Sequence, residues 1–206
     1  MPRQGGETKR RIVDAAYKLF YKGGFARASV DGIADAAGVT KRTFYYHFDS
    51  KQALIAAVLA IQQELALAEI QRWARHVSGD PVDVVEKLFI ELAAWAKQPG
   101  WRGSGFTRAA IEFAHSPGHP ARLAARRHKE AVEGWLTDQF TGNGIGTPQT
   151  LARQVLLLME GCQALVLIHG DTNYAKAAGE AARLLVEHQL SLRSRRLSKT
   201  HAAGRR

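Results

Sequence analysis

The chain has 206 residues, of which 46% are hydrophobic, so it can bury a sizeable core in one large domain or in a small domain beside a larger one. Its formal net charge of +10 favours polyanionic partners, nucleic acid before an anionic membrane. The single cysteine, Cys162, excludes an internal disulfide and fits a reducing cytoplasm.

A first helix is predicted from Thr8 to about Tyr21, after a polar arm over residues 1–6 that we expect to be disordered. Its inward side carries Ile12, Ala16, Leu19 and Phe20. Three basic residues at 9–11 crowd its first turn, where they oppose the positive end of the helix dipole. A nearby DNA backbone and a solvated charge cluster explain them about equally well.

Residues 29–51 predict two short helices separated by a glycine. Ser29 suits the N-cap of the first helix, and Gly38 suits the left-handed position at its C-terminal end. Thr40 can cap the second helix, which ends near His47. Two short helices joined by a glycine-containing turn form a helix-turn-helix, whose second helix can enter a DNA major groove.

The second helix of this pair presents hydrogen-bond donors on its outward surface, and a further lysine lies one turn beyond it. These residues are Lys41, Arg42, Thr43, Tyr45, Tyr46, His47 and Lys51. Such donors suit phosphate oxygens and guanine edges. The alternative explanation is a small helical hairpin with a solvated basic face.

From about Thr8 to Leu54, roughly a quarter of its length, the chain resembles the TetR family of transcriptional regulators. The matching residues are Phe25, Ser29–Ala34, Ala37–Val39, Thr43–Phe48 and Ser50–Lys51, with Ala53 and Leu54. The resemblance implies a homodimeric, all-helical repressor with an N-terminal DNA-binding domain and a C-terminal ligand-binding domain. Asp49 departs from the family, which often has proline there, and should matter little because it joins two helices.

The resemblance also suggests roles. Lys41 and Arg42 lie where base-edge contacts are expected, and an arginine favours guanine by about 1–3 kcal/mol per bidentate contact. Phosphate contacts are expected from Ser29, Thr43, Tyr45, Tyr46, His47 and Lys51. Because a dimer presents two such helices, the expected partner is double-stranded DNA with a palindromic operator, its half-sites about one helical turn apart or more.

Six further helices are predicted between breaks rich in glycine, proline and serine. They cover residues 51–76, 82–97, 104 or 107 to 115, 120–140, 148–169, and 171 or 172 to 192. The predicted fold is therefore all-α, with about nine helices. A three-helix DNA-binding domain over residues 1–52 is joined by the long fourth helix to a ligand-binding and dimerisation domain over residues 53–192. Residues 193–206 hold six basic residues and no acidic one, which predicts a disordered tail.

The predicted helix over residues 148–169 is apolar nearly all round, so it must be covered on more than one side. Gly161 and Ala164 would let a second helix approach closely. With the ninth helix, this pattern predicts a homodimer built as a four-helix bundle. The alternative is burial of both helices within one chain. The apolar segment 155–168 is interrupted by Glu160 and Gln163 and is too short for a membrane span, so no membrane is expected as a partner.

The effector site is predicted from large and polar side chains in the middle helices. The candidates are Trp101, Phe106, Arg108, Phe113, His128, Trp135, Met159 and Gln163. Most such aromatic residues in other proteins fill the core instead. A mainly aromatic, sparsely charged site suits a small hydrophobic effector.

No enzyme, cofactor or metal site is expected from the sequence. Cys162 lies in an apolar helix, where a thiol is inert, and neither a glycine-rich phosphate loop nor a nucleophile elbow occurs. His115, His119 and His128 do not have a known metal-ligand spacing. The expected function is a cytoplasmic, ligand-released repressor. The alternatives are a helix-turn-helix protein with no small-molecule effector and, with little support, a small helical enzyme.

Overall fold

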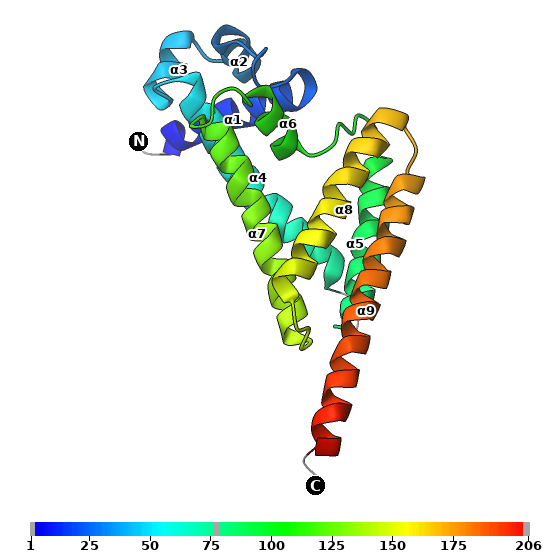
Figure 1. Cartoon of the computed structure of the whole chain (residues 1–206). Helices are drawn as coiled ribbons and strands as arrows, with labels where there is room; N and C mark the ends of the chain where they lie inside the picture. Colours follow the sequence, from blue (N-terminus) through cyan, green and yellow to red (C-terminus); the bar gives the residue numbers. More distant parts are fainter. Residues whose placement is uncertain (1–2, 76–78, 204–206) are drawn as a thin grey trace. The chain divides into compact units, whose positions relative to one another are not determined.

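The computed structural model describes residues 3–75 and 79–203, and within these ranges all regular secondary structure is helical (Figure 1). This confirms the predicted all-α class. The helices are α1 Arg3–Gly23, α2 Val30–Ala37, α3 Lys41–His47, α4 Lys51–Ala74, α5 Pro81–Ala96, α6 Gly105–Glu112, α7 Pro120–Gly142, α8 Pro148–His169 and α9 Asn173–Ala203.

Both ends of the described chain are more helical than the sequence suggests. Helix α1 already includes residues 3–6, which we expected to be disordered, and α9 continues to Ala203 instead of ending near Leu192. This corrects the predicted disordered tail as far as Ala203, while residues 204–206 lie outside the described residues. No glycine or proline follows Gly179 within α9, so each added residue extends an existing helix at little cost. The Nη1 of Arg193 also donates to the carbonyl of Asn143, at 2.7 Å.

The chain packs as two compact units, whose boundaries differ from the predicted division after residue 52. The first unit holds residues up to 66 together with 104–128, and the second holds residues 67–103 together with those from 129 onward. Helix α6 and the first part of α7 therefore belong to the same unit as the helix-turn-helix. Sequence periodicity cannot detect this, because it says only that a helix has an apolar face, not which helices cover that face.

The core of the first unit is built from the apolar faces of its helices. Ile12 and Phe20 of α1, Ile33 of α2, Phe44 of α3 and Leu54 of α4 are buried almost completely. The predicted inward side of α1 is thus confirmed, although its Leu19 is only partly buried. Phe106 and Ala109 of α6 complete this core. Short helices such as α2 and α3 depend on such packing, because they are too short to be stable alone.

The second unit is organised around α5, α8 and α9 with the later part of α7. Leu88 and Leu92 of α5, Leu136 of α7 and Val155 of α8 are fully buried. The helices α5 and α9 approach closely at Gly179, where an added Cβ would lie 2.9 Å from the Cβ of Phe89. Only a glycine fits this crossing without movement of one helix.

Two helices, α4 and α8, are long and apolar enough to cross a membrane by length and composition alone. The apolar segment 155–168 lies within α8, whose bounds agree with the predicted helix over residues 148–169. Each helix also supplies buried residues to a core, among them Leu54 and Val58 in α4 and Leu151 and Val155 in α8. The core residues of soluble domains give helices the same apolar composition.

The close crossing at Gly179 predicts a measurable packing penalty. The variant Gly179→Ala should be less stable than Gly134→Ala by about 1–3 kcal/mol, the typical cost of overpacking a core. Both substitutions add a helix-favouring residue, but an added Cβ at Gly134 in α7 meets nothing within 4 Å. Urea denaturation followed by circular dichroism measures the difference, and equal midpoints for the two variants would contradict the close approach.

Candidate nucleic-acid interface

The helix-turn-helix is built from local capping interactions that the sequence predicted. The Oγ of Ser29 accepts a hydrogen bond from the backbone N–H of Gly32 at 3.0 Å and begins α2. Gly38 ends α2 with a φ of +62°, in the left-handed region where a side chain is strained. The Oγ1 of Thr40 accepts from the N–H of Thr43 at 3.1 Å and begins α3. The turn between the helices therefore has a C-cap for α2 at one end and an N-cap for α3 at the other.

Helix α3 has one inward side chain and a broad exposed surface. Phe44 is fully buried, with its ring against Tyr45 and Phe48. Arg42, Tyr45 and Tyr46 are exposed, and Tyr46 retains 83% of its accessible surface. A tyrosine held outward on a rigid helix offers a hydroxyl donor and an aromatic face to a partner. The exposed side of α3 is therefore chemically suited to a polar, anionic surface.

Lys41, a predicted base contact, already has a partner on α2. Its Nζ lies 3.0 Å from the Oδ1 of Asp31, and both side chains are exposed. The hydrogen bond to Asp31 raises the pKa of Lys41, so the amine stays charged at neutral pH. An exposed ion pair is screened by solvent, so a phosphate or a base edge can displace the carboxylate.

Some of the predicted phosphate contacts also have structural roles. The Nζ of Lys51 donates to the carbonyl of Ala26 at 2.8 Å, and burial lowers the pKa of this amine. The Oγ of Ser29 caps α2, and the Oγ1 atoms of Thr43 and Thr40 lie 2.9 Å apart. The Ser29 hydroxyl accepts in its capping contact and keeps its own proton for a phosphate oxygen, whereas Thr40 and Thr43 share one proton between their two hydroxyls. Lys51, in contrast, must share its ammonium group between the backbone and any anion.

Arg11 is a structural residue of the site that the sequence did not identify. Its Nη2 donates to the carbonyl of Ala37 at 2.5 Å and to that of Gly38 at 3.0 Å, which closes the C-terminal end of α2. An added Cβ at Gly38 would lie 2.9 Å from this nitrogen, so the glycine also makes room for the arginine. The only sequence signal was the basic cluster at 9–11, which we had considered for phosphate binding or solvation.

Helix α6 supplies two further contacts that the sequence missed. The Oε2 of Glu112 accepts from the N–H of Ala26 at 2.8 Å, so both backbone groups of Ala26 are held, one by Glu112 and one by Lys51. The Nη1 of Arg108 donates to the carbonyl of Tyr21 at 3.1 Å, near the end of α1, and its guanidinium lies over the Tyr21 ring. These contacts hold the connection between α1 and α2.

The eight predicted effector residues are divided between the two units. Phe106, Arg108, Phe113 and His128 lie in the first unit, and Trp101, Trp135, Met159 and Gln163 lie in the second. The rings of Phe106 and His128 stack with centroids 4.0 Å apart. In α8 the Nε2 of Gln163 donates to the carbonyl of Met159 at 3.1 Å. Arg108 is engaged with Tyr21, which gives it a structural role.

Two of the groups considered for catalysis or metal binding, Cys162 and His119, make structural contacts. Burial raises the pKa of the Cys162 thiol to about 12, and its Sγ donates to the carbonyl of Met159 at 3.2 Å. The Nδ1 of His119 accepts from the N–H of Ala121 at 3.1 Å in the first turn of α7, and burial lowers the pKa of this imidazole. Within residues 3–75 and 79–203, no three His, Cys, Asp or Glu side chains gather where they could hold a metal ion.

Comparison with known proteins places this architecture among transcriptional regulators. The family model described as "Bacterial regulatory proteins, tetR family" matches residues 12–58. The chain is 36% identical over 86 residues to the HTH-type transcriptional regulator TtgR of Pseudomonas putida, covering 42% of this chain and 41% of that protein. It is 38% identical over 71 residues to the HTH-type transcriptional regulator UidR of Escherichia coli, covering 34% and 36%. The matches thus span about two fifths of these relatives' length.

Solved structures extend the likeness over most of the chain. A TetR-family transcriptional regulator from Streptomyces coelicolor is 26% identical with a TM-score of 0.75, covering 90% of this chain and 95% of that chain. The reduced form of NemR of Escherichia coli, at 17% identity, has the same fold with a TM-score of 0.77, covering 85% and 95%. The overall fold is therefore shared well beyond the segment of clear sequence similarity.

The contacts of Arg11 predict a stabilising role in the helix-turn-helix of α2 and α3. Replacing Arg11 with alanine should lower the stability of α2 by about 1.5–3 kcal/mol, because two carbonyls lose a charged hydrogen-bond donor. Hydrogen exchange of the amides in α2 measures this loss. Arg10→Ala is the matched control, since Arg10 is exposed on the same helix. Equal exchange rates in the two variants would contradict the assigned role.

Proposed function

Because the chain belongs to the TetR family of transcriptional regulators, we propose that it binds a palindromic operator as a homodimer and represses transcription until a small molecule releases it. The observation that carries the proposal is the exposed, donor-rich surface of α3 at the end of a closed helix-turn-helix. Members of this family are transcriptional regulators and not enzymes, which removes the small helical enzyme from consideration.

In this proposal α3 enters the major groove and Arg42 donates to a guanine edge. Arg42 is exposed and makes no hydrogen bond or ion pair within the described part of the chain, so its guanidinium is available for two parallel contacts. Lys41 supplies a second donor once Asp31 is displaced. Tyr45 and Tyr46 donate to phosphates and set the register of the helix on the duplex. The ten basic and five acidic residues in the first 54 add a sequence-independent attraction.

The dimer interface is proposed on α8 and α9. Leu157 and Ile168 of α8 remain 72% and 71% exposed, and Leu184 of α9 remains 57% exposed. Gly161 and Ala164 lie between the two α8 residues at helical spacing, and an added Cβ at Gly161 meets nothing within 4 Å. A second copy presents the same apolar face, so a two-fold axis covers both surfaces at once and produces a four-helix bundle.

Release by an effector is proposed through α4. This helix is continuous from Lys51 to Ala74, so a displacement of its C-terminal end changes the position of α3, which directly precedes it in the chain. The effector then acts by binding more tightly to the conformation that does not fit the operator. A helix-turn-helix protein without a small-molecule effector remains the second candidate. In either case the protein acts in the cytoplasm, where the operator DNA is located.

The assignment of Arg42 predicts a loss of specificity. Arg42→Ala should weaken binding to the DNA upstream of the protein's own gene by about 10–100-fold, while binding to random DNA changes much less. Fluorescence anisotropy with labelled duplexes at moderate salt measures both affinities. Lys97→Ala is the control, because Lys97 is an exposed lysine in the second unit, outside the helix-turn-helix. Equal losses on specific and random DNA would reassign Arg42 to the phosphate backbone.

The proposed interface predicts that a charge on α8 separates the subunits. Leu157→Arg should convert the dimer to a monomer, because two arginines would meet across the two-fold axis in an apolar environment. Light scattering coupled to size-exclusion chromatography measures the mass. Ile90→Arg is the matched control, since Ile90 of α5 is 60% exposed outside the proposed face. A dimeric Leu157→Arg protein would place the interface elsewhere.

A further inference from the structure

Three of the chain's four tryptophans form a cluster in the second unit. Trp73 lies in α4, Trp95 in α5, and Trp101 in the loop between α5 and α6. The ring centroids of Trp73 and Trp95 are 6.4 Å apart, and those of Trp95 and Trp101 are 5.6 Å apart with nearly perpendicular planes. All three side chains are only partly buried. We call these three residues the tryptophan cluster.

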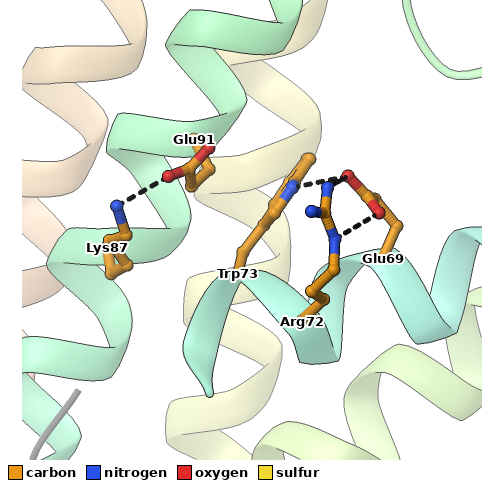
Figure 2. A network of polar contacts seen from close by, with 5 residues as sticks. All are labelled: Glu69, Arg72, Trp73, Lys87 and Glu91. Atoms are coloured by element: carbon orange, nitrogen blue, oxygen red, sulfur yellow. Dashed lines mark hydrogen bonds and ion pairs between the residues drawn. The ribbon is translucent and has the colours of Figure 1, made fainter. Parts of the chain in front are cut away.

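The indole nitrogens at the two ends of the tryptophan cluster differ in their partners. The Nε1 of Trp73 donates to the Oε1 of Glu69 at 3.0 Å, and Arg72 holds the same carboxylate (Figure 2). The Nε1 of Trp101 is buried and has no hydrogen-bond partner among the described residues. An indole N–H can only donate, and buried donors are nearly always paired. Trp101 therefore presents a donor that an acceptor atom of a ligand would complete.

The backbone around Trp101 allows its ring to move. Gly100 and Gly103 flank it with φ values of +77° and +73°, in the left-handed region. Glycine occupies both signs of φ with little energetic difference, so this loop can change conformation without the strain that other residues would suffer. A ligand reaches the buried Nε1 of Trp101 only if this indole turns away from its edge-on contact with Trp95.

The acids of the polar network drawn in Figure 2, beside the tryptophan cluster, have basic partners. Glu69 pairs with Arg72 on α4, and the hydrogen bond from Arg72 lowers the pKa of the Glu69 carboxyl. Lys87 pairs with Glu91 on α5 at 2.6 Å (Figure 2). Because each acid in this network has a basic partner, the network offers no unpaired charge to a ligand. The paired charges of this network therefore give no preference for an ionic ligand.

We propose that the tryptophan cluster binds a neutral, planar aromatic molecule that bears a carbonyl oxygen. The aromatic rings pack against Trp95, and the carbonyl oxygen accepts the hydrogen bond from the Nε1 of Trp101. The inference rests on the proposed function only in naming this molecule as the effector. Binding itself depends on the cluster alone.

The test compares two probes of the same shape, 2-acetylnaphthalene, which carries the acceptor, and 2-ethylnaphthalene, which lacks it. Quenching of tryptophan fluorescence on titration gives both dissociation constants. The wild-type protein should bind the ketone about ten-fold more tightly than the hydrocarbon. The variant Trp101→Phe keeps an aromatic ring but loses the donor, so it should bind both probes equally. Tyr174→Phe removes a hydrogen-bond donor from α9, elsewhere in the same unit, and should retain the ten-fold preference.

A structural readout keeps the proposal testable if Trp101→Phe does not fold, which circular dichroism would show. In wild-type protein with 15N-labelled indoles, the N–H resonance of Trp101 should move downfield with the ketone and not with the hydrocarbon. No binding of the ketone, equal binding of both probes by the wild type, or a preference that persists in Trp101→Phe would each overturn the proposal.

Operator binding separates the failure of this inference from the failure of the proposed function. Gel shifts of the wild-type protein without any probe should show a specific complex with the upstream DNA. If the protein forms a specific complex with DNA but shows no preference for the ketone, the tryptophan cluster is not the proposed binding site and the proposed function still stands. If the protein prefers the ketone but forms no specific complex with DNA, the tryptophan cluster is a binding site but not the site of an effector that releases DNA.

Discussion

The first unit, which contains the helix-turn-helix, depends on two arginine side chains that donate hydrogen bonds to carbonyls near the C-terminal ends of α1 and α2. The last carbonyls of a helix have no partner within it and carry the negative end of its dipole. Arg108 donates to the carbonyl of Tyr21 near the end of α1, and Arg11 donates to those of Ala37 and Gly38 at the end of α2. Because α2 and α3 are too short to be stable alone, these closures and the common apolar core determine where α3 lies.

The same interactions explain why α6 belongs to the unit that holds the helix-turn-helix. Its Arg108 and Glu112 contact the backbone of residues 21–26, more than eighty positions earlier in the chain. Its Phe106 and Ala109 fill the core beneath. The loop that carries Trp101 leads directly into this helix. In the proposed function, a ligand held by Trp101 therefore acts on a segment that is covalently continuous with the contacts that position α3.

The surface of α3 that we propose contacts DNA combines residues held in place by other parts of the chain with residues that remain exposed. Phe44 is buried in the core, and Thr40 caps the first turn of α3, so contacts within the chain fix this helix. Tyr46 and Arg42 point to solvent, where they add little to folding stability. Lys41 is intermediate, because its pairing with Asp31 is exposed and replaceable. In the proposed function, most of the conformational freedom of α3 is therefore lost on folding, and little more is lost when DNA binds.

The sequence by itself determined the helical class, the caps at Ser29 and Thr40, the glycine at position 38 and the burial of Phe44, because each follows from residues within a few positions of one another. It also indicated the family. Only the tertiary structure decided that Lys51 and Glu112 bind the backbone of Ala26 and that Arg11 donates to a carbonyl at the end of α2. It also decided that α6 belongs to the same unit as the helix-turn-helix. These pairings join residues 25 to 86 positions apart. Helical periodicity identifies an apolar or polar face, but the partner of that face is determined by how the whole chain packs.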